Sequence, residues 1–405
     1  MPWRETCRMD ERVKFMAAWL EGEESRSSLC ARHGISRKTG YKWASRYAAD
    51  PLGGLANRTH VPLNIPHKIE AGVAALIVAL RRQRPSWGPR KLRAALMRRE
   101  PERGWPAAST IGDLLRREGL VQRRRCRSSP LVQTQPFAGV TQANDTWCVD
   151  FKGWFRTGDG QRCDPLTVSD AYSRYLLSCR IVPPTGEGVQ PVIERLLREH
   201  GLPGAIRSDN GPPFASTAAG GLSRLSVSWL KLGIRLERIE PGCPQQNGRH
   251  ERMHRTLKAE TARPPAADPV AQQVCFDVFR QVYNEERPHE ALGQVPPATV
   301  WRPSLRSYPA RIEDPVYRPD HAMRRVRSNG EIKWGGDLVF ISEALIGELV
   351  GVAETEAGDW IVRFIDVDLG IIDRTTRKLR RFTAPRPGRR EAGTPTQSVT
   401  HPPGP

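Results

Sequence analysis

Apolar residues recur at three- and four-residue spacing between residues 10 and 48, which predicts a small helical unit. Asp10 can cap the first helix. A second short helix is expected over residues 27–33, and Gly34 can end it because glycine accepts the left-handed backbone that a helix stop requires. The apolar face expected for the first helix holds Val13, Met16 and Leu20.

The next helix follows Ser36, which can cap it, and begins with basic residues. A short helix, a glycine turn and a basic second helix are typical of a helix-turn-helix, which inserts the second helix into the DNA major groove. A three-helix bundle without a ligand is the alternative. Expected in the core are Leu29, Ile35, Tyr41 and Trp43, and expected to face DNA are Arg37, Lys38 and Lys42.

Residues 51–66 are rich in Pro and Gly and predict a linker between residues 1–50 and a second helical unit over 67–125. The apolar stripe and the break at 86–89 make this unit similar to a second helix-turn-helix. From residue 81 to 127 there are 15 Lys plus Arg against four acids, which favours phosphate contact over a merely solvated face. The stripe is Ile69, Val73, Leu76 and Leu80, and the candidate DNA-binding residues are Arg90, Lys91, Arg123, Arg124 and Arg125.

The pattern changes after a basic linker over 126–142. Residues 143–303 contain three strands close together and then helices that alternate with short strands, which predicts a mixed sheet with helices on its faces. The strands are expected at 147–155, 166–172, 175–182, 205–208 and 234–239, and the helices at 188–200, 222–232, 249–261 and 270–286.

The remaining chain predicts a linker, a small β-domain and a tail. Residues 304–330 are rich in Pro and Arg, and residues 331–383 alternate apolar and polar positions between glycine turns, which suits a small SH3-like β-barrel. Residues 384–405 have the composition of a disordered tail. The fold class is therefore multidomain: all-α helix-turn-helix units, a central α/β core and a C-terminal β-barrel.

The net charge of the chain limits the classes of partner that it can bind. The 405 residues carry a formal net charge of +19, which favours a polyanion such as nucleic acid over a merely soluble basic surface. No apolar run approaches the length of a membrane span, and the start of the chain has no apolar signal segment, so we expect a cytoplasmic protein without membrane contact. The eight cysteines include no C-x-x-C pair and are expected to be reduced thiols.

Three acids stand out in the central region. Asp150 lies in an apolar strand, Asp209 ends another strand, and Glu251 lies in the first turn of a helix. Acids at two strand ends and on a neighbouring helix can converge, and an all-oxygen ligand set suits Mg²⁺ or Mn²⁺, two of which can serve phosphodiester chemistry. Taken singly, each acid has a simpler explanation: a strand-edge residue, a turn signal, and a complement to the helix dipole.

The surrounding motifs resemble the DDE catalytic core of insertion-sequence transposases and retroviral integrases. They are WCVDF (147–151), SDAYSRY (169–175), RSDNGPPF (207–214), NGRHER (247–252), RTLK (255–258) and YNEERPHEAL (283–292). The resemblance implies a ribonuclease-H-like fold and a catalytic, metal-binding triad of Asp150, Asp209 and Glu251 that holds two Mg²⁺ or Mn²⁺ ions. The spacing of Asp209 and Glu251 is slightly longer than is usual in the family, and the extra length is expected within 216–228.

Several neighbours of the triad are candidates for lesser roles. Arg255 and Lys258 share a helix face with Glu251 and are expected to hold DNA beside the metals, unless that face is merely solvated. His254 could contact substrate. Asp170 is expected to be structural, and His289 to pack and cap.

The resemblance implies a bacterial transposase, associated with the nucleoid when bound to DNA. It would bind the terminal inverted repeats of its element as a homodimer or higher oligomer, cleave the 3′ ends and transfer them to target double-stranded DNA. Two alternatives stay open: a helix-turn-helix regulator with a degenerate core, and a ribonuclease-H-like nuclease that only hydrolyses.

Overall fold

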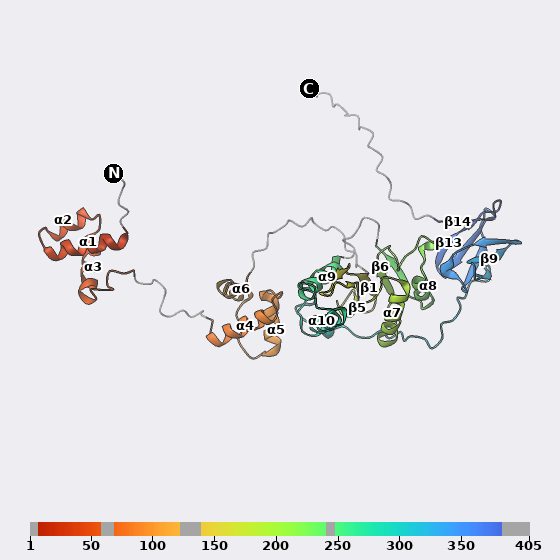
Figure 1. The fold of residues 1–405 in the computed structure, drawn as a ribbon, viewed down its shortest axis with the longest axis horizontal. Coiled ribbons are helices and arrows are strands. Elements are labelled where there is room, and N and C mark those ends of the chain that lie inside the picture. Colours follow the sequence, from red (N-terminus) through yellow and green to blue (C-terminus); the bar gives the residue numbers. More distant parts are fainter. Residues whose placement is uncertain (1–6, 58–68, 122–138, 240–247, 383–405) are drawn as a thin grey trace, which may run out of the picture. The chain divides into compact units, whose positions relative to one another are not determined.

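The computed structural model describes residues 7–57, 69–121, 139–239 and 248–382 (Figure 1). The chain divides into two compact units, residues 1–69 and 70–405. Arg123, Arg124 and Arg125 and the tail over 384–405 lie outside the described residues. Within the described part, no helix is both long and apolar enough to cross a membrane.

The first unit is the expected set of three helices. Gly34, at φ 60°, makes the turn before the third helix, and the Ser36 hydroxyl accepts a hydrogen bond from the Thr39 amide at 3.2 Å. The sequence therefore gives correct stop and start signals for the turn. The helices are α1 (Arg8–Glu21), α2 (Arg26–Arg32) and α3 (Arg37–Ala49), and the buried residues are Phe15, Met16, Leu29, Cys30 and Leu55.

The predicted apolar face of α1 is partly wrong. Val13 and Leu20 are exposed, whereas Phe15 and Met16 are buried. Cys7 caps the helix, so Asp10 lies inside it. The larger Phe15 ring turns the helix so that its own side points inward, because burying a bigger apolar surface releases more free energy. Tyr41 is also exposed and touches Trp19 only edge-on, at 5.2 Å between ring centroids.

The second unit begins with another three-helix cluster. Val73, Ile77 and Leu80 are buried, and Leu76 is at the surface, so the predicted stripe is wrong by one position. Arg81 donates a hydrogen bond to the Leu120 carbonyl at 2.9 Å and so ties the first helix to the end of the cluster. The helices are α4 (Ala71–Gln83), α5 (Pro89–Arg99) and α6 (Ala108–Arg117).

The central region contains the predicted mixed sheet, in the order β5-β4-β1-β6-β7. β1 runs antiparallel to β4 and parallel to β6, and β6 runs parallel to β7. β1 ends earlier than predicted because the chain turns into a separate two-stranded hairpin of β2 (Phe155–Arg156) and β3 (Arg162–Cys163). The sheet strands are β1 (Thr146–Phe151), β4 (Pro165–Asp170), β5 (Leu176–Ile181), β6 (Ala205–Ser208) and β7 (Arg235–Arg238).

Helices cover both faces of this sheet (Figure 1). Trp147 and Val149 of β1 join the apolar cluster of α7 and α8, and the alternating positions of β1 point to the other face. That other face carries α9 and α10, with α10 followed by a π-helical turn over Val282–Glu286. The helices are α7 (Gly186–His200), α8 (Arg224–Lys231), α9 (Gly248–Thr261) and α10 (Pro269–Gln281).

The C-terminal region is antiparallel sheet, as expected, but the closed barrel is not confirmed. Its strands form one five-stranded and one two-stranded sheet, and no sheet closes among the described residues. The five-stranded sheet also includes β8, which lies inside the predicted linker. The strands are β8 (Ala322–Arg325), β9 (Glu331–Trp334), β10 (Asp337–Phe340), β11 (Leu349–Glu354), β12 (Trp360–Phe364), β13 (Val367–Ile372) and β14 (Leu379–Arg381).

The C-terminal sheet packs directly on the central region. Ala219, Leu222 and Val227 of the central region are buried in the same apolar cluster as the C-terminal strands. Lys231 of α8 adds an ion pair with Glu348 at 2.8 Å. The glycine- and serine-rich stretch at 216–228 therefore provides a platform for the C-terminal sheet.

Candidate active site

The strand register brings Asp150 and Asp209 to the same level of the sheet. β1 and β6 are parallel neighbours, with Trp147 opposite Ile206 and Cys148 opposite Arg207. Continuing this register by two residues sets Asp150 beside Asp209, where adjacent strands lie about 4.8 Å apart. The pleat turns Asp150 away from the face of Trp147 and Val149 and toward α9, which carries Glu251 in its first turn.

Electrostatics links all three carboxylates. Burial, followed by the negative charges of Asp209 and Glu251, raises the pKa of Asp150 to about 7. Asp209 and Glu251 themselves are exposed. One half-desolvated carboxylate beside two exposed ones is an arrangement that a bound cation would stabilise. All of these ligand atoms are oxygen, so the residues fit Mg²⁺ or Mn²⁺.

Two buried histidines of α9 bind the helix to β4, the strand that pairs with the strand of Asp150. The Thr167 hydroxyl lies opposite Asp150 in the sheet and donates to the Asp150 carbonyl at 3.0 Å. It has one proton, so it must accept from the Nε2–H groups of both His250 and His254, each at 2.7 Å. The Ser169 hydroxyl then donates to His250 Nδ1 at 2.9 Å.

This network assigns His254 a different place from the one predicted. His254 is only 5% exposed and turns toward Thr167, so it does not face incoming substrate. Its Nδ1, without a proton in this tautomer, lies 4.0 Å from Asp150 Oδ2. Burial lowers the pKa of His254 to about 2 and that of His250 to about 3, so both rings are neutral.

The ring nitrogens of His250 and His254 lie within 4.8 Å of Asp150 as a three-residue group that could hold a metal. Hydrogen bonds occupy both ring nitrogens of His250, which removes it from such a set. The group is therefore better described as a hydrogen-bonded support for Asp150, with His254 Nδ1 as a neutral neighbour.

Two basic residues share the exposed face of α9 with Glu251. Arg255 and Lys258 are exposed together with Glu251, at i+4 and i+7. Lys152, which the sequence reading missed, also belongs here: burial lowers its pKa, Lys258 lowers it further, and Asp150 raises it. The sequence could have indicated Lys152, because it follows Asp150 by two residues and alternate residues of an extended chain point to the same side. In the structure its amide donates a hydrogen bond to the Pro165 carbonyl at 3.0 Å.

Asp170 has a structural role. It is buried, and its carboxylate accepts hydrogen bonds from the Asn144 amide at 2.8 Å, the Ser173 amide at 2.7 Å and the Ser173 hydroxyl at 2.6 Å. These bonds hold the turn between β4 and β5.

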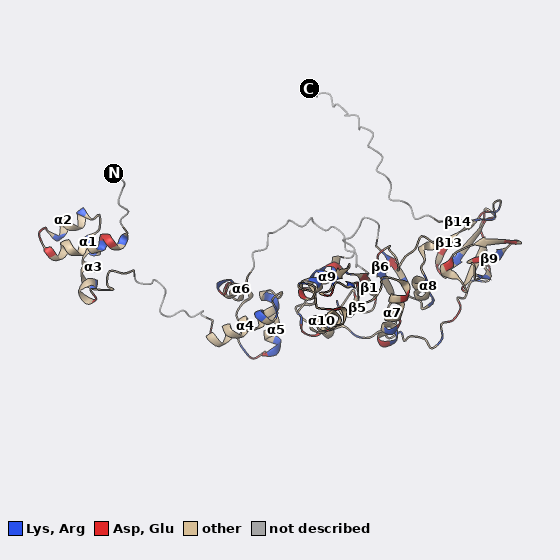
Figure 2. Cartoon of the chain, viewed as in Figure 1, with Lys and Arg blue, Asp and Glu red and all other residues tan. Residues whose placement is uncertain are grey.

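The candidate DNA-binding residues have contrasting surroundings. In the first unit Arg37, Lys38 and Lys42 are all exposed at the start of α3. In the second unit Arg90 pairs with Glu290 at 2.7 Å, and the Lys91 ammonium donates to the Pro288 carbonyl. Figure 2 shows how densely Lys and Arg occupy α5.

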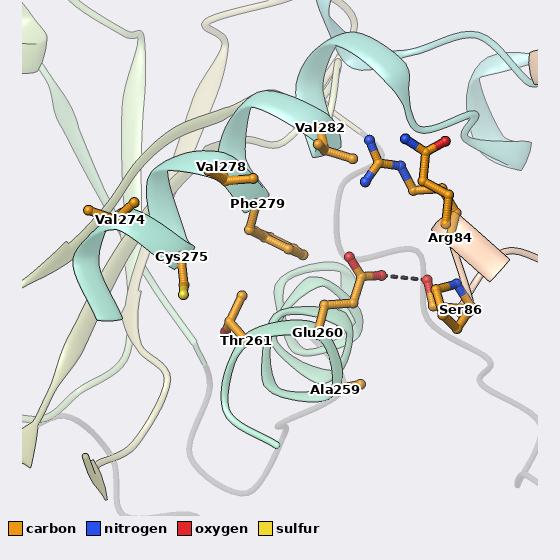
Figure 3. Close-up of a pocket in the computed structure, with 12 residues that line it drawn as sticks. Arg84, Ser86, Ala259, Glu260, Thr261, Val274, Cys275, Val278, Phe279 and Val282 are labelled. Atoms are coloured by element: carbon orange, nitrogen blue, oxygen red, sulfur yellow. Dashed lines mark hydrogen bonds between the residues drawn. The ribbon is translucent and has the colours of Figure 1, made fainter. Parts of the chain in front are cut away.

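The α4–α6 cluster contacts the central region through charged groups. Arg84 pairs with Glu286 at 2.9 Å, and Ser86 donates a hydrogen bond to Glu260 at the end of α9 (Figure 3). Arg287 pairs with the same Glu260 at 2.8 Å. Basic residues that the sequence assigned to phosphate contact are therefore partly used to hold acids of the central region.

Comparison with known families agrees with this architecture. Two models described as integrase core domain match residues 140–244 and 232–297. The chain contains an integrase core domain. A helix-turn-helix model matches residues 11–59 and a homeodomain-like model matches residues 39–115.

Relatives from insertion elements cover most of the chain. It is 28% identical to the uncharacterized 39.2 kDa protein of insertion element IS476 from Xanthomonas euvesicatoria, over 69% of this chain and 79% of that protein. It is 29% identical to the uncharacterized 31.7 kDa protein of insertion element IS407 from Burkholderia multivorans, over 63% and 89%. Among solved structures, a simian T-cell lymphotropic virus intasome matches 76% of this chain and 100% of that chain, at 16% identity and a TM-score of 0.34.

The family models and the insertion-element relatives confirm the resemblance to insertion-sequence transposases with an integrase-type core. The helix-turn-helix domains lie N-terminal to the integrase core, in the order that the sequence predicted.

Proposed function

We propose that this protein is a DDE transposase that binds the terminal inverted repeats of an insertion sequence, cleaves the 3′ ends and transfers them to target DNA. Asp150, Asp209 and Glu251 would hold two divalent ions. When bound, such ions lower the pKa of an attacking water or hydroxyl and stabilise the leaving oxygen. The observation that carries the proposal is the parallel register of β1 and β6, which brings Asp150 to the level of Asp209 on the face of the sheet that α9 covers, and the raised pKa of Asp150 supports it.

The chain's own residues would divide the remaining work. The Thr167 hydroxyl donates a hydrogen bond to the Asp150 carbonyl, and His250 and His254 hold that hydroxyl in place. Arg255 and Lys258 lie exposed on the helix face of Glu251, where they would hold DNA phosphates against the carboxylates.

End recognition would belong to the helical domains. Arg37, Lys38 and Lys42 at the start of α3 would enter the major groove, as basic residues of a recognition helix do. Arg90 and Lys91, together with Arg123, Arg124 and Arg125, would add phosphate contacts. Since two ends must be joined, we expect a homodimer or higher oligomer on DNA.

A two-end strand-transfer assay tests this function. The substrate is a pair of duplexes carrying the DNA ends that flank the gene, with a plasmid target and Mg²⁺ or Mn²⁺. Wild-type protein should join ends to the plasmid, and Asp150→Ala should bind ends without joining them. Glu194→Gln on α7, which removes a carboxylate paired only with Arg198, is the matched control.

The same assay separates the two alternatives. A regulator with a degenerate core would bind ends and neither cut nor join them in any metal. A purely hydrolytic nuclease would cut DNA but leave the plasmid without joined ends. Either result would overturn the proposed transposase activity.

A further inference from the structure

A second charged site lies on a different face of α9 from Glu251. It is a cavity of about 360 Å³ between α5, the turn before β5, α9 and the segment after α10. Arg249, Arg252 and Thr256 line it at helical spacing i, i+3 and i+7, whereas Glu251 points elsewhere on the same helix. At about 100° per residue, the two faces are well separated around the helix.

The cavity has a strong excess of positive charge. Five of its lining residues are cations and one, Glu290, is an acid. Glu290 already pairs with Arg90 at 2.7 Å. The cations are Lys91, Arg174, Arg249, Arg252 and Arg287.

Two of these cations donate hydrogen bonds to carbonyl oxygens. Arg249 donates to the Ala171 carbonyl at 3.1 Å, and Lys91 donates to the Pro288 carbonyl. Arg287 pairs with Glu260 at 2.8 Å. A carbonyl oxygen satisfies a hydrogen bond without cancelling the charge of the donor.

Arg174 carries the argument furthest. Its Nη1 atom is buried and has no hydrogen-bond partner within the described part of the chain. Its backbone adopts φ 66°, a conformation that costs free energy for a residue other than glycine. The Asp170 carboxylate, through Ser173, holds the turn that presents it. A strained backbone and a buried guanidinium nitrogen without a hydrogen bond are each costly, and a ligand that accepts from Nη1 would offset the second cost.

The mutual repulsion is visible in the titration of the group. Burial and then the charge of Arg287 lower the pKa of Lys91 to about 8. Burial and then the charge of Arg249 lower the pKa of Arg174 to about 10. An anion in the cavity would oppose the repulsion between the cations and so raise both pKa values.

We propose that this cavity binds a backbone phosphate of DNA and clamps it between the α4–α6 cluster and the integrase core. The inference rests on the proposed function for the choice of DNA over another phosphate source. Arginine donors in a fork geometry suit phosphate oxygens, and the cavity draws them from both parts of the chain. A bound phosphate would therefore also strengthen the contact between α5 and the core.

The test combines DNA affinity with stability in the full-length protein. The variants are Arg174→Gln and Lys91→Gln, and the matched control is Arg195→Gln, which removes an exposed cation on α7. A 30-base-pair duplex of arbitrary sequence serves as the probe, because phosphate contacts do not depend on sequence. Binding is measured without divalent metal across a salt series, and melting temperature is measured without DNA.

Each cavity variant should bind the duplex about 10-fold more weakly and lower the slope of log affinity against log salt by about 0.9. The DNA-free variant should melt at or above the wild-type temperature, because a repelling charge is gone. A merely structural Arg174 would instead give a lower melting temperature, which would overturn the inference.

Two further outcomes identify the source of the phosphate. If inorganic phosphate stabilises wild-type protein but not Arg174→Gln, and both keep the same salt slope with DNA, the cavity is a free-anion site and the DNA proposal fails. Because these assays need no metal or chemistry, absent strand transfer with an intact salt-slope effect would overturn only the proposed function. Normal strand transfer without a change in salt slope in the cavity variants would overturn only the proposed phosphate site.

Discussion

Two faces of α9 carry charge of opposite sign. The face of Glu251 lies beside Asp150 and Asp209, and burial together with the charges of Asp209 and Glu251 raises the pKa of Asp150. The face of Arg249 and Arg252 lines a cavity with five cations and one acid. Folding alone does not favour such concentrations of like charge, so each face is best explained by a ligand of the other sign.

Between these faces lies a third, which is neutral and held by buried hydrogen bonds. His250 and His254 point into the sheet and share the hydroxyl of Thr167. One helix thus separates a proposed cation site from a proposed phosphate site with a buried hydrogen-bond network. The comparison teaches that neutral, hydrogen-bonded groups build the support, while concentrations of like charge mark where ligands would bind.

The largest effect is expected when the acidic face of α9 loses the charge of Glu251. Glu251→Gln keeps the size of the side chain but removes a charge, so strand transfer should fall by about 1,000-fold or more because the ions lose a ligand. The joining of labelled ends to a plasmid measures the change, with Glu194→Gln as the control. Joining by Glu251→Gln at more than a tenth of the wild-type rate would contradict the role of Glu251.

The next largest effect is expected when the neutral face of α9, which holds His250 and His254, loses its hydrogen-bond partner. Thr167→Val keeps the shape of the side chain but leaves two buried histidine N–H groups without an acceptor, so unfolding free energy should fall by about 2–3 kcal/mol. Urea denaturation measures it. The control is Thr256→Val, whose hydroxyl bonds only to the Arg252 carbonyl of its own helix, at 3.2 Å. Equal losses in both variants would show that the shared hydroxyl has no special role.

A third effect is the pH dependence of stability that comes from His289, which lines the cationic cavity. Burial, Lys91 and then Arg287 lower the pKa of His289 to about 3. A histidine whose pKa is lower in the folded state stabilises the fold fully above its unfolded value near 6.5, and that stability is lost as pH falls toward 3. His289→Gln should therefore reduce by about 2 kcal/mol the loss of stability between pH 7 and pH 4.5. An unchanged pH slope would contradict a buried neutral His289.

The smallest expected effect concerns the ion pairs between the α4–α6 cluster and the segment after α10. Glu286 pairs with Arg84 at 2.9 Å and with Arg99 at 3.6 Å, and these side chains are partly exposed. Glu286→Gln should therefore cost less than about 1 kcal/mol, and less still in high salt. Thermal melting at two salt concentrations measures the cost. A loss above 3 kcal/mol would mean that this pair is a main support of the α4–α6 cluster.

Local patterns predicted most of the helices and strands of the central region. The strand at 205–208 was predicted residue for residue, because a short apolar run ends at a clear Asp-Asn-Gly turn signal. The position of Glu251 on α9 also followed from a helix start signal. Asp150 could be recognised as unusual because a carboxylate in an apolar strand needs a partner.

Features that depend on distant contacts could not be read from the sequence. The inward side of α1 was set by how Phe15 packs, and the stretch at 216–228 found a partner in C-terminal strands more than 90 residues away. The cationic cavity collects residues from 91 to 287, and no local spacing brings Arg174 beside Lys91. The use of Arg90 to pair Glu290 likewise appears only in three dimensions.

The most direct test of the central claim is Mn²⁺ binding to the full-length protein with bound end DNA, followed by electron paramagnetic resonance. The account predicts two ions per chain for wild-type protein and loss of both sites at the same concentration in Asp150→Asn. Metal-free Asp150→Asn should be at least as stable as wild type, because a half-buried charge has been removed. Equal Mn²⁺ binding by Asp150→Asn and wild-type protein would contradict a cation site built on Asp150, Asp209 and Glu251.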